Sequence, residues 1–117
     1  MKKRILFVDD ERNILDALAR FLRRNFSLTT ACGPEEGLKL LNDGESFAVV
    51  VSDYTMPGMN GIEFLGRAGE RLPRSIRIML TGNADLGTAI DAVNEGNIFR
   101  FLTKPCSPEM LIKALEA

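Results

Sequence analysis

The sequence contains no histidine and no tryptophan among its 117 residues, and it has only two cysteines. Without histidine the chain has no means of forming a histidine-based catalytic triad, a histidine metal site or a phosphohistidine. Cys32 and Cys106 lack the CxxC spacing and companion ligands of a zinc site, so we interpret them as ordinary buried or bystander thiols. Any chemistry must therefore use carboxylates, hydroxyl groups and lysine.

Long apolar runs and a strong net charge are also lacking. The apolar run near the N-terminus covers residues 5–8, whereas a signal peptide needs about 7–15 apolar residues. No stretch approaches the roughly 20 apolar residues of a membrane span, so we expect a soluble, cytoplasmic protein without a membrane partner. The net charge of −1 gives no reason to expect nucleic-acid binding. A composition of 45% hydrophobic and 26% charged residues is typical of one globular domain, here 1–117.

Apolar runs and helical periodicity alternate along the chain. Strands are predicted at 5–8, 26–31, 47–52, 75–80 and 98–103, and helices at 14–22, 34–41, 61–71, 86–93 and 108–115. The run 47–52 is typical of a buried central strand and the alternating 26–31 of an edge strand, while Gly33 and Ser107, each before a proline, predict helix N-caps. This order predicts an α/β fold with a parallel sheet covered by helices on both faces. The last helical pattern has no glycine cap, which fits a fragment of a longer protein.

Reactive side chains follow four of the five predicted strands. Parallel α/β sheets bind ligands at the carboxyl ends of their strands, and those ends carry Asp9, Asp10, Asp53, Thr81 and Lys104. Three neighbouring carboxylates repel one another unless a cation lies among them. Because all the donors are oxygens, Mg²⁺ or Mn²⁺ is the expected ion, bound directly by Asp10 and Asp53, while Asp9 acts through water or orients a neighbouring group.

A divalent ion, a hydroxyl group and a lysine together fit phosphoryl transfer, with Asp53 as the nucleophile and Gly82 allowing close backbone approach. Each residue also has a simpler interpretation when it is taken alone. Asp9 or Asp10 could cap the first helix, Thr81 could be a turn residue and Lys104 a solvated surface lysine.

The combined pattern resembles the receiver domain of two-component response regulators over essentially the whole chain. The resemblance rests on Asp9-Asp10, Asp53 with Met56-Pro57 and Gly61, Thr81-Gly82 and Lys104-Pro105. It implies a flavodoxin-like sheet of order 2-1-3-4-5. It also implies that Asp53 accepts a phosphoryl group from a sensor histidine kinase or phosphotransfer protein, and that Asp9, Asp10, Asp53 and the backbone carbonyl of Thr55 bind Mg²⁺.

The resemblance further implies a switch. The Thr81 hydroxyl would move toward the phosphoryl group and Phe101 would turn into the vacated space, although Phe101 could also be an ordinary core residue. The surface formed by 86–93, 98–103 and 108–115 would then change, and it would form a homodimer or contact a C-terminal output domain. The stretch 95–105 resembles receivers joined to HD-type cyclic-dinucleotide phosphodiesterase modules. The implied strand order places Cys32 and Cys106 about 19 Å apart, too far for a disulfide.

Two other functions share part of this pattern. A Mg²⁺-dependent phosphohydrolase of the haloacid dehalogenase type also uses an aspartate nucleophile, but it needs a second aspartate where this chain has Thr55, and it carries a cap domain. A flavin or nucleotide carrier would place phosphate near the acidic segment 9–11, and no GxGxxG or P-loop pattern is present. We therefore expect phosphorylation of the chain itself, without independent substrate turnover.

Overall fold

The computed structural model describes residues 2–82, 100–103 and 107–116. In chain order its elements are β1 (Lys3–Asp9), α1 (Arg12–Leu22), β2 (Phe26–Cys32), α2 (Pro34–Asn42), β3 (Val49–Asp53), α3 (Gly61–Arg71), β4 (Ile76–Thr81), β5 (Arg100–Thr103) and α5 (Pro108–Glu116). The predicted helix at 86–93 and the first two residues of the predicted strand 98–103 lie outside the described residues.

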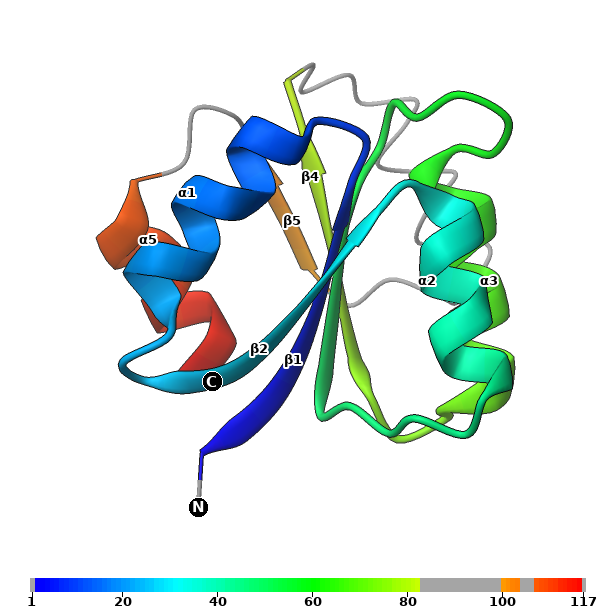
Figure 1. Ribbon diagram of the computed structural model, residues 1–117, viewed down its shortest axis with the longest axis horizontal. Coiled ribbons are helices and arrows are strands. Elements are labelled where there is room, and N and C mark those ends of the chain that lie inside the picture. Colours follow the sequence, from blue (N-terminus) through cyan, green and yellow to red (C-terminus); the bar gives the residue numbers. More distant parts are fainter. Residues whose placement is uncertain (1, 83–99, 104–106, 117) are drawn as a thin grey trace.

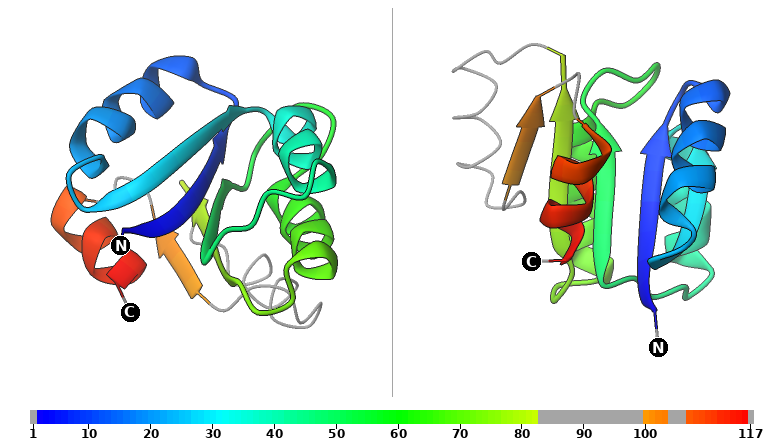
Figure 2. Two further views of the ribbon diagram at one scale, coloured as in Figure 1. Left: turned by 60° about the horizontal axis from the view of Figure 1, so that its bottom comes forward. Right: turned by 90° about the vertical axis from the view of Figure 1, so that its left-hand side faces the viewer.

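The five strands form one parallel sheet in the order β2-β1-β3-β4-β5. Helices α1 and α5 cover one face of this sheet, and α2 and α3 cover the other (Figures 1 and 2). The predicted strand order and the helices on both faces are therefore confirmed. None of the helices within the described residues is long and apolar enough to cross a membrane.

Two apolar cores lie on opposite faces of the sheet, and the central strands supply both. On β1, Ile5 and Phe7 belong to the core beneath α1 and α5, whereas Leu6 and Val8 belong to the core beneath α2 and α3. All five residues of β3 are buried. A strand buried on both faces needs apolar side chains at successive positions, which explains the uninterrupted apolar run that predicted it.

The strand ends differ from the prediction by one or two residues, and the difference matters at the site. β3 begins at Val49 rather than at residue 47 and includes Asp53, while β4 extends to Thr81. Phe47 is buried outside the strand, beneath the Arg4 guanidinium at 4.8 Å from the ring centre. Asp53 and Thr81 therefore belong to the hydrogen-bonded sheet instead of being the first residues of loops.

Both predicted helix caps are confirmed. Gly33 is the N-cap of α2, with a φ of 99° that side-chain-bearing residues rarely adopt, and Pro34 follows it. At α5 the Ser107 hydroxyl oxygen accepts a hydrogen bond of 3.2 Å from the Met110 N–H. Both α2 and α5 thus begin directly after a residue type that is favourable at the N-cap.

Candidate functional site

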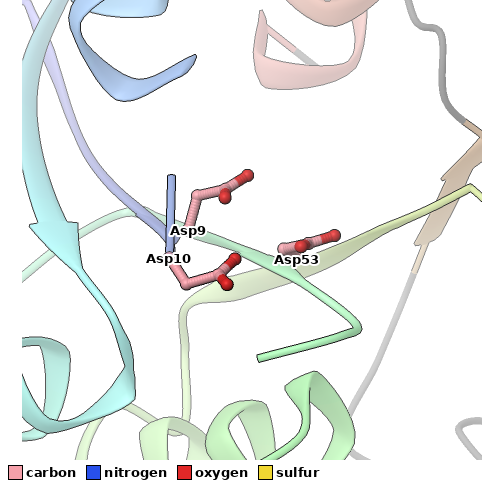
Figure 3. A group of neighbouring side chains, drawn as sticks. All are labelled: Asp9, Asp10 and Asp53. Atoms are coloured by element: carbon pink, nitrogen blue, oxygen red, sulfur yellow. The ribbon is translucent and has the colours of Figure 1, made fainter. Parts of the chain in front are cut away.

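Three carboxylates meet where β1 and β3 end. Asp9 and Asp53 are the last residues of these adjacent strands, and Asp10 follows Asp9. One carboxylate oxygen from each residue lies within 4.8 Å of the other two (Figure 3). Asp9 is fully buried, Asp53 is 8% exposed and Asp10 is exposed. The structure thus brings together the three acids that the sequence predicted to share one edge of the sheet.

The backbone beneath these acids is held by hydrogen bonds from neighbouring elements. The Asp9 carbonyl accepts from the Gly33 N–H at 2.9 Å, and the Tyr54 N–H donates to the Leu80 carbonyl at 2.9 Å. The buried Ser52 hydroxyl donates to the Asp53 carbonyl at 3.0 Å. A site carried on a fixed backbone keeps its carboxylates in place when a charge binds among them, because little has to rearrange.

The interpretation of Asp9 or Asp10 as a helix cap is wrong. The N-cap of α1 is Glu11, and its side chain makes no capping hydrogen bond. Asp9 Oδ1 instead accepts a hydrogen bond of 2.9 Å from the Glu11 N–H, before the helix begins. Capping of α1 therefore does not explain the presence of Asp9 and Asp10 at these positions.

Gly61 has a role at the site that the sequence analysis missed. Its N–H donates to the Tyr54 carbonyl at 2.8 Å, which brings the start of α3 against the end of β3. A Cβ atom at this position would clash with the Asp53 carbonyl oxygen and lie 3.0 Å from the Tyr54 Cα. The sequence showed a glycine in a turn-rich loop, and nothing in that pattern indicated the close contact with the backbone of Asp53.

Of the other predicted site residues, Thr81 lies at the same edge of the sheet as the three acids. Thr81 ends β4, next to β3, and is 3% exposed. Thr55 is exposed in the loop after β3, and Lys104 lies outside the described residues. No atom of the described residues beyond its chain neighbours lies within 4 Å of the position that a Cβ atom at Gly82 would take. Its predicted close approach to a phosphoryl group stays a prediction.

Phe101, the predicted switch residue, is half-buried on β5. It pairs with Met79 of β4 and packs against the core beneath α2 and α3. Partial burial leaves its ring in contact with solvent and with the core at the same time. Both the switch and the ordinary core residue remain compatible with this placement.

The acid cluster fits a hard divalent cation. Mg²⁺ binds oxygen ligands at about 2.0–2.1 Å, so ligands on opposite sides of the ion are about 4.2 Å apart. The carboxylate oxygens, all within 4.8 Å of one another, reach this spacing by side-chain movements of less than about 1 Å. The Cys32 thiol instead donates a weak hydrogen bond of 3.6 Å to the Asp10 carbonyl oxygen. The donors are therefore of the type that Mg²⁺ and Mn²⁺ prefer.

Comparison with known proteins agrees with this geometry. The family described as "Response regulator receiver domain" matches residues 5–116. The hydrogenase transcriptional regulatory protein HoxA of Cupriavidus necator is 38% identical over 92% of this chain, and the transcriptional regulatory protein FlgR of Helicobacter pylori is 36% identical over 96%. The chain spans only 22% and 28% of these two relatives' lengths.

Solved structures give the same result for the fold. A CheY-like receiver domain protein from Methanospirillum hungatei has a TM-score of 0.91 and 31% identity, over 99% of this chain and 92% of its own. The signal receiver domain of an HD domain-containing protein from Pseudomonas fluorescens has a TM-score of 0.90 and 34% identity, over 99% and 93%. A structure described as an adenylate cyclase from Rhodopirellula baltica has a TM-score of 0.92 and 42% identity, over 99% and 86%.

The family match, the strand order and the three acids at the ends of β1 and β3 agree with one another. They favour a phosphoacceptor signalling module over the phosphohydrolase alternative. The chain belongs to the receiver domain family of two-component response regulators.

Proposed function

We propose that Asp53 accepts a phosphoryl group from a phosphohistidine of a sensor histidine kinase or phosphotransfer protein, and that the phosphorylated domain is the signal. The observation that carries this proposal is the position of Asp53, at the end of a fully buried strand and beside two further carboxylates. In the transfer, an Asp53 carboxylate oxygen forms a bond to phosphorus, the donor's nitrogen–phosphorus bond breaks, and the electron pair remains on the histidine.

Asp9, Asp10, Asp53 and the backbone carbonyl of Thr55 would hold Mg²⁺ or Mn²⁺, which when bound neutralises charge on the phosphoryl oxygens. Thr81 would donate its hydroxyl proton to one phosphoryl oxygen, and Lys104 would place its ammonium group beside another. Asp53 thus acts both as nucleophile and as ligand. The domain undergoes phosphorylation and loss of its own phosphoryl group, without turnover of an independent substrate.

Movement of Thr81 toward the phosphoryl group would leave space for the Phe101 ring. This ring is half-buried on the edge strand β5, on the face that packs against the core beneath α2 and α3, so its rotation would change the exposed surface at this edge of the sheet. We propose that the changed surface, formed by 86–93, 98–103 and α5, forms a homodimer or contacts a C-terminal output domain. The short span of this chain within HoxA and FlgR supports an output domain. A receiver that takes its phosphoryl group from a sensor kinase would act in the cytoplasm, which is the location we propose.

The decisive experiment is incubation of the full chain with acetyl phosphate, with and without Mg²⁺, followed by intact-mass measurement. The chain should gain the mass of one phosphoryl group only when Mg²⁺ is present. The variant Asp53→Asn should gain none, while Asp43→Asn, which removes an exposed acid beyond α2, should be labelled like the unmodified chain. Labelling of Asp53→Asn, or steady turnover of a phosphate ester, would contradict the proposal.

A further inference from the structure

A groove of about 530 Å³ lies at the opposite edge of the sheet from the acid cluster. It is formed where β1 begins, where the chain enters β3 and where α3 connects to β4, at the bottom of the view in Figure 1. Three arginines line it: Arg4, Arg71 and Arg74. We call it the arginine groove. The domain thus carries acidic groups at one end of its strands and guanidinium groups at the other.

The arginine groove has more positive than negative charge. Arg4 is paired with Glu45 at 3.2 Å and lies over the Phe47 ring at 4.8 Å. Arg71 and Arg74 make no ion pair with any residue in the parts of the chain that the structure describes. Two guanidinium charges in one concave surface therefore remain without a carboxylate, in a chain whose net charge is −1.

The wall of the groove is held by a buried arginine. Arg77 on β4 is 5% exposed, and its Nη1 donates to the carbonyls of Leu72 at 3.3 Å and Ser75 at 3.4 Å. Burial lowers the pKa of its guanidinium from the usual value, and arginine nonetheless stays protonated in proteins. The Ser75 hydroxyl adds a bond of 2.7 Å to the Leu72 carbonyl. The segment that carries Arg74 is thus fixed before any ligand arrives.

The same hydrogen bonds reduce the repulsion that an anion would meet at the carboxyl end of α3. The carboxyl end of a helix carries partial negative charge, which would repel an anion near Arg71 at the end of α3. The Leu72 carbonyl at this end already accepts from the Ser75 N–H, the Ser75 hydroxyl and Arg77. The partial negative charge of this carbonyl is therefore offset by three donors within the protein, which reduces the repulsion that an anion would meet there.

We propose that the arginine groove binds an organic phosphate of about the size of a mononucleotide. Guanidinium groups bind phosphate through two parallel N–H bonds, and two of them here have no partner acid. The groove is within the roughly 300–1,000 Å³ of small-molecule sites. Leu72 and Pro73 supply apolar wall for the organic part of the ligand, and the Ser46 hydroxyl supplies a polar contact. The site is separate from Asp53 and independent of its phosphorylation.

The test is a titration of the ¹⁵N-labelled full chain with adenosine 5′-monophosphate in metal-free buffer, followed by amide chemical shifts. We expect saturable one-to-one shifts in segments 46–48 and 71–75, with no shifts at Asp9 and Asp53. The same titration of Asp53→Asn should be unchanged, so failure of the phosphorylation proposal would leave this one standing. Absence of saturable shifts in those two segments would overturn it.

Matched variants decide whether the guanidinium groups are responsible. The double variant R71Q/R74Q should bind at least tenfold more weakly, whereas R23Q/R24Q, which removes the same charge from the exposed end of α1, should bind normally. Equal loss of nucleotide affinity in both double variants would overturn the proposed site, because it would show a general effect of net charge. Pyrophosphate should compete with the nucleotide, and adenosine binding as tightly as the nucleotide would show that phosphate is not recognised.

Discussion

Replacing Asp10 with asparagine should raise the stability of the metal-free domain. It should also reduce the additional stability that Mg²⁺ binding gives, relative to the unmodified domain. Asp10 is exposed, and one of its carboxylate oxygens lies within 4.8 Å of oxygens from both Asp9 and Asp53. Its negative charge therefore costs stability unless a cation is bound. Asparagine keeps the shape of the side chain and removes its charge. The same variant should therefore show both the higher stability without metal and the smaller gain from Mg²⁺.

The magnitude follows from the spacing of the carboxylates. Two unit charges 4.8 Å apart repel by about 0.9 kcal/mol at the dielectric constant of water. Asp10 takes part in two such pairs, about 1.7 kcal/mol before screening by salt, and we expect a net gain of about 1 kcal/mol. For a domain of this size that corresponds to a rise in Tm of about 4 °C.

Mg²⁺ should reverse this order of stability. At a free concentration of one hundred times Kd the unmodified domain gains about 2.7 kcal/mol, or about 11 °C. Loss of a ligand weakens metal affinity at least about tenfold, as loss of outer ligand partners already does. The variant would then gain about 1.4 kcal/mol, or about 6 °C, at the same Mg²⁺ concentration.

Thermal unfolding followed by circular dichroism, in EDTA and in Mg²⁺ at matched ionic strength, measures both effects. Asp16→Asn is the control, because it removes an exposed acid of α1 that makes no ion pair with the described residues. It should behave like the unmodified domain in both buffers. A less stable Asp10→Asn in EDTA, or an equal gain from Mg²⁺ in all three proteins, would refute the reasoning.

Three further predictions concern the framework of the site. Gly61→Ala should lower the free energy of unfolding by about 1–3 kcal/mol and weaken Mg²⁺ binding, because its Cβ would push against the Asp53 carbonyl. A Cβ atom at Gly82 would meet no atom of the described part of the chain within 4 Å, so thermal melts should show a smaller loss of stability for Gly82→Ala than for Gly61→Ala. Arg77→Met should cost about 1–3 kcal/mol in urea unfolding, since the Leu72 and Ser75 carbonyls lose a donor; unchanged stability would contradict that role. Phe101→Ala should leave phosphorylation of Asp53 intact by intact mass but abolish phosphorylation-dependent dimerisation in size-exclusion chromatography, whereas an ordinary core residue would alter both states equally.

Much of this architecture is determined by the sequence itself. The continuous apolar run before Asp53, which is short and rich in β-branched residues, favoured a strand buried on both faces, and such strands occur in parallel sheets covered by helices. The alternating order of strands and helices then placed Asp9, Asp53 and Thr81 at the same edge, because parallel strands end together. The cap residues Gly33 and Ser107 acted locally, through contacts within a single helical turn, and so could be predicted from their own neighbours.

The tertiary structure decided what depends on contacts between distant segments. The reason for Gly61 is the approach of α3 to the backbone of β3, and no local pattern distinguishes that need from a turn. The arginine groove joins three segments that the sequence separates, so no local pattern brings Arg4, Arg71 and Arg74 together. Local residue types and periodicity specify elements and the edge at which the acids meet. The pairing and packing of those elements specify distances, and distances determine whether charges act singly or as a site.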